Sequence, residues 1–202
     1  MNNFQRGLAL VGALLLSTLP VQAQDSGEGL SAKDIIAKLA PKKTRAIGVG
    51  TGGVTEEQKG ELTEILDPER SIGLKERKKI AVIEKEAKMP SLDFPIYFGY
   101  NSAEISEDSF ATLKILGEAL ASDALSKSIF LVKGHTDSKG NAGYNQRLSE
   151  ARAGAVVDYL AAKYSIDAKR LKAIGYGESQ IKIPDDPESG DNRRVELVNT
   201  TL

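Results

Sequence analysis

The chain has 202 residues, with 27 Lys and Arg against 28 Asp and Glu, so its formal net charge of −1 gives no global attraction to nucleic acid. It has no cysteine, which excludes disulfides and thiolate metal sites. Few aromatic residues, no tryptophan and no repeated alternating segments of strand length argue against a membrane barrel. The length suits one compact domain with an extension of several dozen residues.

The first residues, 1–23, are typical of a secretory signal peptide. Arg6 supplies a positive start, residues 8–19 form an apolar run too short to span a bilayer, and small residues precede Gln24. The alternative is a retained membrane anchor, which the short apolar run and Pro20 disfavour. A signal peptide implies export, and the chain has no lipobox cysteine that could be acylated. We therefore expect the mature protein in the periplasm without a lipid anchor.

Residues 24–89 are predicted to form an N-terminal extension or linker. Ser31 and Asp34 resemble a capping box at the start of a short amphipathic helix that ends before Pro41. The glycine-rich run at 45–53 lacks the Lys-Ser/Thr ending of a phosphate-binding loop, which favours a flexible connector.

Two charge-rich segments follow in this extension, at 55–66 and 74–88, and both are plausible helices. We interpret them as a solvated linker or marginal helices. The alternative is a segment that becomes ordered when it docks on another envelope protein.

A new pattern begins after Pro90, so residues 90–202 are predicted to form the folded domain. Alternating apolar residues indicate strands and apolar residues at helical spacing indicate helices. The predicted elements are a strand at 92–98, a helix at 107–121, a strand at 128–132, a helix at 144–164 and strands at 171–176 and 195–198. This β-α-β-α-β-β order predicts an α+β domain with helices packed on a mixed sheet.

The helix predicted from Tyr144 places Arg152 inside its apolar stripe rather than on its solvent face. A buried guanidinium is costly without a carboxylate, so we expect an acidic partner. Asp137, in the polar turn before the helix, is the natural internal candidate. Either the two residues form a structural salt bridge, or they face one pocket and bind the ammonium and the carboxylate of a zwitterion.

A set of short motifs resembles the OmpA-like peptidoglycan-binding domain of OmpA, MotB and Pal, here without a barrel or a lipobox. The resemblance covers roughly residues 92–199. The motifs are Asn101-Ser102-Ala103-Glu104-Ile105, Gly134-His135-Thr136-Asp137, Tyr144-Asn145, Leu148-Ser149-x-x-Arg152-Ala153, Gly175-Tyr176-Gly177-Glu178 and Asn192-Arg193-Arg194-Val195-Glu196. Their shared order and spacing make the signal specific.

The resemblance implies that Asp137 and Arg152 hold the D-centre of meso-diaminopimelate, or an equivalent residue of a wall stem peptide. Thr136 and Asn145 fit supporting roles beside them, and the start of the helix adds N–H groups that favour a carboxylate. The resemblance also implies that Asn101 and Arg193 complete the pocket wall. We expect an internal Asp137–Arg152 bridge in the empty pocket, and neither a cofactor nor a metal.

His135, the single histidine of the chain, has no second histidine or cysteine with which to build a familiar metal or catalytic site. We therefore expect a structural role for it, and a protein that is not an enzyme. The function expected is non-covalent peptidoglycan binding in the periplasm, at the cell wall, with or without contact with the outer membrane. The alternative is an adaptor in which residues 24–89 dock another envelope protein.

Overall fold

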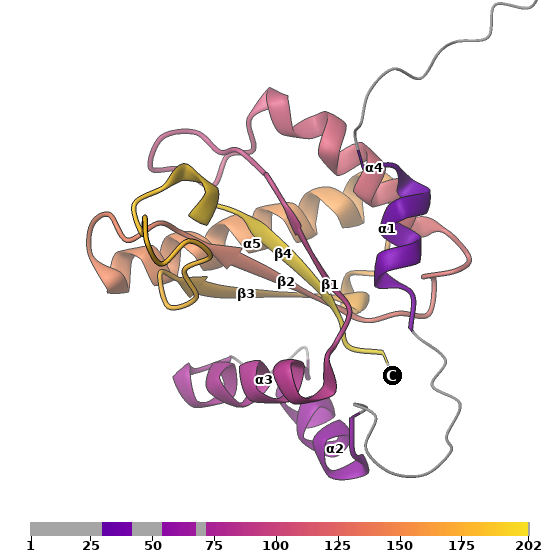
Figure 1. The fold of residues 1–202 in the computed structure, drawn as a ribbon. Coiled ribbons are helices and arrows are strands. Elements are labelled where there is room, and N and C mark those ends of the chain that lie inside the picture. Colours follow the sequence, from indigo (N-terminus) through magenta and orange to yellow (C-terminus); the bar gives the residue numbers. More distant parts are fainter. Residues whose placement is uncertain (1–29, 42–53, 68–71, 202) are drawn as a thin grey trace, which may run out of the picture.

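The computed structural model describes residues 30–41, 54–67 and 72–201 (Figure 1). The predicted signal peptide and the glycine-rich connector lie outside these residues. The helices are α1 (Ala32–Leu39), α2 (Glu56–Ile65), α3 (Leu74–Ala87), α4 (Phe110–Ala121) and α5 (Ala142–Tyr164). The strands are β1 (Ser91–Phe94), β2 (Phe130–His135), β3 (Leu171–Gly177) and β4 (Val195–Asn199). Three short 3₁₀ turns, Glu107–Ser109, Ala168–Arg170 and Gly190–Asn192, lead into α4, β3 and β4 respectively.

The four strands form one mixed sheet in the order β1-β4-β2-β3. β2 runs parallel to β3, whereas β4 runs antiparallel to both β1 and β2. From residue 91 onward the element order is β-α-β-α-β-β, so the predicted α+β class and mixed sheet are confirmed. The first strand is shorter than predicted: Pro95 directly follows Phe94, and proline has no N–H to donate to a ladder.

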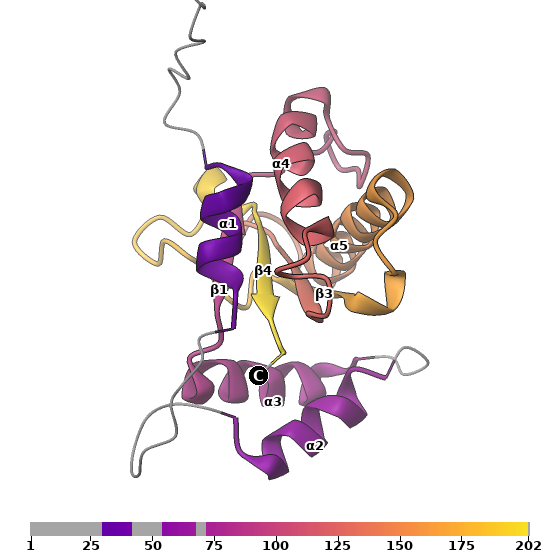
Figure 2. The same cartoon turned by 90° about the vertical axis from the view of Figure 1, so that its right-hand side faces the viewer.

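Helices cover both faces of the sheet (Figures 1 and 2). α1, α4 and α5 lie on one face, and α2 and α3 lie on the other. The long helix α5 begins two residues earlier than predicted, because the side chain of Asn141 accepts hydrogen bonds from the backbone N–H groups of Gly143 and Tyr144. Glycine is required where α5 meets the sheet: a Cβ on Gly175 would lie 2.5 Å from the backbone nitrogen of Glu150.

The described part of residues 24–89 packs on the domain, which differs from the linker interpretation. Ser31 and Asp34 form the predicted capping box of α1, and Ile35 and Leu39 of that helix are buried in the main core. On the other face, α2 and α3 enclose a second core with the sheet. Its buried members are Leu62, Ile65, Ile80, Ile83, Ala87, Met89, Leu131, Ile174, Tyr176 and Val198. The division at residue 90 stays a prediction.

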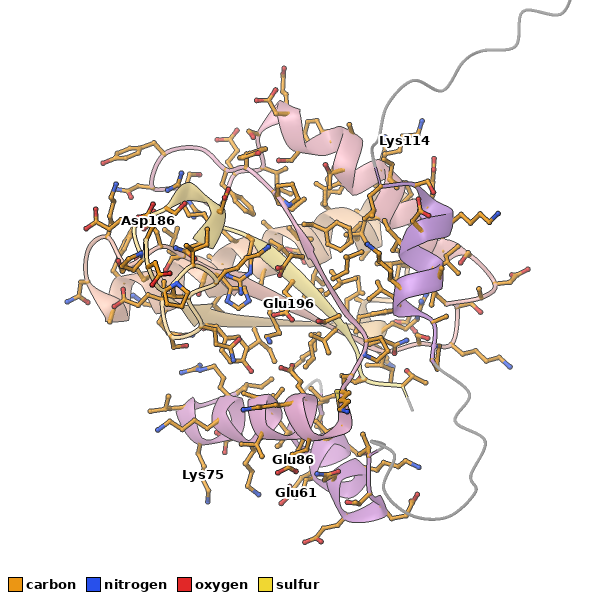
Figure 3. The ribbon with its side chains drawn as sticks, viewed as in Figure 1. Glu61, Lys75, Glu86, Lys114, Asp186 and Glu196 are labelled. Atoms are coloured by element: carbon orange, nitrogen blue, oxygen red, sulfur yellow. The ribbon has the colours of Figure 1, made fainter. Side chains whose placement is uncertain are left out.

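Charged residues dominate the sequences of α2 and α3 and hide the apolar residues that these helices bury against the sheet. Glu61, Lys75 and Glu86 lie on the side of the two helices turned away from the sheet (Figure 3). The opposite side of α3 carries Ile80 and Ile83, which are 0% and 3% exposed. A charged helix with one narrow apolar face forms a stable element only when a partner covers that face, and here the partner is the sheet.

A buried ion cluster joins α3 to the sheet. The Nζ of Lys133 lies 2.9 Å from a carboxylate oxygen of Glu84 on α3 and 3.0 Å from one of Glu196 on β4. The same ammonium lies 4.7 Å from the centre of the Tyr176 ring. The side chain of Lys133 is only 3% exposed, so these neighbours take the place of water around its ammonium.

Candidate functional site

A pocket of about 750 Å³ opens where β2 ends and α5 begins, near the loop that follows β1. All six residues predicted for the site line it: Asn101, Thr136, Asp137, Asn145, Arg152 and Arg193. The remaining lining residues are Phe98, Gly99, Tyr100, Lys139, Gly140, Tyr144 and Leu148. Segments that are far apart in the sequence therefore meet around one cavity.

Asp137 lies in the turn that follows β2. The backbone holds this turn in place: the N–H of Thr136 donates to the carbonyl of Gly177, and the N–H of Lys139 donates to Oδ1 of Asp137. The other carboxylate oxygen, Oδ2, lies 2.6 Å from Nη1 of Arg193. Both oxygens are thus engaged, and the carboxylate is largely buried, with 10% of its side chain exposed.

The predicted bridge between Asp137 and Arg152 is wrong. The Nε of Arg152 donates to the backbone carbonyl of Ser102 at 2.9 Å, and its guanidinium lies 4.9 Å from the centre of the Phe98 ring. Among the described residues, no carboxylate forms an ion pair with it. The loop after β1 supplies a carbonyl and an aromatic face instead, a combination that holds a guanidinium without neutralising it.

The charge of Arg152 is therefore uncompensated. Burial lowers the pKa of its guanidinium, and the neighbouring charge of Arg193 lowers it further, whereas Tyr144 and Asp137 act in the opposite direction. Arginine stays protonated even so. Its two terminal nitrogens make no hydrogen bond within the described part of the chain, which leaves the planar fork available to an anion.

The two predicted supporting residues differ in their roles. The side-chain oxygen of Thr136 is buried and has no hydrogen-bond partner among the described residues. The amide nitrogen of Asn145, in contrast, donates to the carbonyl of Lys139 at 2.9 Å and to a carboxylate oxygen of Glu178 at 2.6 Å. Asn145 therefore holds the turn in place with its amide, while Thr136 lines the pocket and its buried hydroxyl has no partner among the described residues.

The loop after β1 forms the opposite wall. Asn101 has a φ of 51°, in the left-handed region that asparagine tolerates better than most residues. The turn is closed by the N–H of Ser102, which donates to the carbonyl of Gly99 at 3.1 Å. Tyr100 next to Asn101 is 96% exposed. Neither Tyr100 nor Phe98 belongs to the predicted site, and the alternating apolar pattern gave Phe98 only the role of a strand residue.

His135 lies outside the pocket, in the ion cluster beside α3. Its Nε2 is 3.4 Å from a carboxylate oxygen of Glu196, and its ring stacks on Tyr176 with centroids 5.8 Å apart. Burial lowers the pKa of the imidazole, against the raising effect of Glu196. Within residues 30–41, 54–67 and 72–201, no three His, Asp or Glu side chains are grouped so as to hold a metal. None of the helices in these ranges has the length and hydrophobicity of a membrane span.

Comparison with known proteins yields a match to the model of the OmpA family at residues 97–195. Outer membrane porin F of Pseudomonas aeruginosa is 36% identical over 112 residues, which cover 54% of this chain and 31% of that protein. Outer membrane protein A of Escherichia coli O157:H7 is 38% identical over 96 residues, 48% of this chain and 28% of that protein. The chain thus spans about a third of the length of the curated relatives it matches.

Among solved structures, the cell wall anchor of the T6SS from Pseudomonas aeruginosa is 30% identical. The superposition covers 52% of this chain and 75% of that chain, with a TM-score of 0.43. The OmpA-like domain of FopA1 from Francisella tularensis is 25% identical. Its superposition covers 54% of this chain and 70% of that chain, with a TM-score of 0.46.

Proposed function

We propose, from the premise that residues 97–195 form an OmpA family domain, that the protein binds peptidoglycan non-covalently through the stem peptide. In this proposal Asp137 receives an ammonium and Arg152 a carboxylate of the same residue, the D-centre of diaminopimelate. Thr136 adds its free hydroxyl, and Asn101 and Arg193 form the walls. The protein acts as a binding module without catalysis, in the periplasm and attached to the cell wall.

The observation that carries the proposal is the unpaired charge of Arg152. Its guanidinium is packed between a backbone carbonyl and an aromatic ring, and it lines the same pocket as the carboxylate of Asp137. An ion held in this way costs free energy, which an anionic ligand would recover. A stem-peptide centre that carries one ammonium and one carboxylate offers a carboxylate to Arg152 and an ammonium to Asp137.

Cosedimentation with insoluble sacculi tests this function. Asp137→Asn removes the charge of the carboxylate at nearly constant size, and Arg152→Lys keeps the charge but loses the planar fork. Each is expected to reduce the apparent affinity for sacculi about tenfold or more, since charge-assisted hydrogen bonds are worth about 1.5–3 kcal/mol. Matched controls are Arg147→Gln and Asp158→Asn, two exposed residues of α5 that do not line the pocket.

Equal recovery of wild type and folded site variants in the pellet would refute the site. Failure of the wild type to sediment would refute peptidoglycan binding itself. Release of soluble fragments from sacculi by the pure protein would contradict the absence of catalysis.

An adaptor role is a second candidate, because α3 carries two exposed apolar residues. Leu74 and Val82 on α3 are 62% and 53% exposed. In this role they contact another envelope protein while the OmpA family domain holds the wall. Cross-linking in cells with wild type and with a Leu74→Ser, Val82→Ser variant tests it, and an unchanged set of cross-linked partners would contradict it.

A further inference from the structure

The charges that line the pocket are unequal in number. Three cationic side chains, Lys139, Arg152 and Arg193, face the single carboxylate of Asp137. Lys139 has its own partner at the surface, Glu188, at 3.8 Å. Since Arg193 pairs with Asp137, Arg152 is the cation left without a carboxylate among the described residues.

A ligand with one ammonium and one carboxylate does not resolve this imbalance. Its carboxylate would pair with Arg152, but its ammonium would compete with Arg193 for Asp137. Both oxygens of Asp137 are already hydrogen-bonded, one to Arg193 and one to a backbone N–H, so the ammonium displaces Arg193 or shares the carboxylate with it. The uncompensated charge then moves from Arg152 to Arg193.

A small cavity lies where a second carboxylate would compensate Arg193. It has a volume of about 130 Å³ and is lined by Ile96, Tyr97, Phe98, Arg152, Gly190 and Arg193. It adjoins the main pocket, because Phe98, Arg152 and Arg193 line both. The volume equals that of a few water molecules, which is enough for a carboxylate.

The lining of this cavity favours an anion. It contains two guanidinium groups and no acidic side chain. Arg193 uses only Nη1 for Asp137, and its Nε and Nη2 make no hydrogen bond to the described residues. Half of the Arg193 side chain is exposed, so it has room to turn from Asp137 towards the cavity.

We propose that the ligand brings one ammonium and two carboxylates to the pocket, and that the second carboxylate binds in the small cavity between Arg152 and Arg193. This proposal rests on the proposed function and narrows its ligand class. In a stem peptide the residue before diaminopimelate is a γ-linked glutamyl residue, whose α-carboxylate supplies the second charge. A peptide in which that carboxylate is amidated lacks the second negative charge.

The experiment is calorimetric titration with two synthetic tripeptides, L-Ala-γ-D-Glu-meso-diaminopimelate and its D-glutamyl α-amide. Both are acetylated at the N-terminus and amidated at the L-centre carboxyl group of diaminopimelate, so that the D-centre keeps its ammonium and its carboxylate. The two peptides then differ only in the α-carboxylate of the glutamyl residue. The wild type is expected to bind the free acid about tenfold more tightly than the amide, the effect of one charge-assisted contact. Arg193→Gln is expected to bind the two peptides equally.

Two further variants control for charge and folding. Arg147→Gln removes an exposed arginine of α5 and is expected to keep the tenfold preference, and Arg193→Lys is expected to keep part of it. Equal binding of both peptides by the wild type, or an unchanged preference in folded Arg193→Gln, would overturn the second carboxylate site while leaving peptidoglycan binding intact. Failure of the wild type to bind either peptide would overturn the proposed function as well.

Discussion

Asp137 forms its ion pair with Arg193, which follows it by 56 residues, and not with Arg152 in the adjacent helix. The pairing neutralises the guanidinium of Arg193 and leaves that of Arg152 without a carboxylate partner among the described residues. Arg193 is half exposed, whereas Arg152 is largely buried. The pocket therefore combines a buried guanidinium that has no carboxylate partner among the described residues with a carboxylate that is already paired with a half-exposed arginine.

The ring of Phe98 is expected to affect binding through Arg152. Phe98→Leu removes the aromatic face under the guanidinium but keeps an apolar side chain, so a cation–π contact of about 0.5–2 kcal/mol is lost. We expect the affinity for the stem tripeptide to fall by about fivefold, with little change in melting temperature. Calorimetric titration and thermal unfolding check this, with exposed Phe110→Leu as the matched control. An unchanged affinity would show that the ring does not position Arg152.

Asn145 is expected to stabilise the turn that carries Asp137. Asn145→Ala leaves the carbonyl of Lys139 and the carboxylate of Glu178 without their donor, at a cost of about 1–3 kcal/mol. Asn145→Asp is expected to cost more, because it places a carboxylate against that of Glu178. Urea unfolding measures both free energies, and Asn145→Asp being as stable as the wild type would contradict this role.

Lys133 is expected to hold α3 on the sheet. Lys133→Met leaves the carboxylates of Glu84 and Glu196 buried without their cation, which costs about 3–5 kcal/mol for a broken buried pair. The control is Lys79→Met, which breaks an exposed pair with Glu61 and is expected to change stability only slightly. Urea unfolding of both variants checks the difference, and similar unfolding free energies would contradict the importance of the buried cluster.

The same cluster predicts a loss of stability in acid. Burial alone would raise the pKa of Glu196, but His135 and Lys133 outweigh it and lower the pKa from the ordinary 4.5 to about 2. As the pH falls, Glu196 is protonated in the unfolded chain before it is protonated in the folded protein. Its contribution to the free energy of unfolding is therefore fully present above pH 4.5 and is lost as the pH falls towards 2.

Comparison with Glu196→Gln isolates this contribution. The raised pKa of Glu84 acts in the opposite direction, through burial, but Glu84 is present in both proteins. The stability advantage of the wild type over the variant should therefore shrink between pH 4.5 and 2. Urea unfolding at several pH values checks this, and an advantage that does not change with pH would rule out the depressed pKa.

The order of elements was predictable because alternating and helical apolar patterns are local signals. Phe110, Leu113, Leu116 and Leu120 mark one face of α4 without reference to any other segment. The packing of α2 and α3 was not predictable in this way. Ile80 and Ile83 form too narrow a stripe among charged residues to be assigned to a core until the sheet that covers them is known.

The six site residues that line the pocket were predictable from the motifs, but the other lining residues and the pairing of the charges were not. Spacing along one helix and turn suggested that Asp137 would meet Arg152. The pairing with Arg193 depends on how β4 is placed beside β2, which local spacing does not contain. The contact of Arg152 with Phe98 likewise depends on the path of the loop after β1.

The most direct test of peptide binding in this pocket is a two-dimensional ¹H–¹⁵N NMR titration of the protein with the blocked tripeptide L-Ala-γ-D-Glu-meso-diaminopimelate. We predict saturable shifts concentrated at residues 98–102, 136–140 and 144–152 and at Arg193, and the absence of these shifts in Asp137→Asn at the same peptide concentrations. No shifts in the wild type, or shifts centred on another surface and retained in Asp137→Asn, would contradict it.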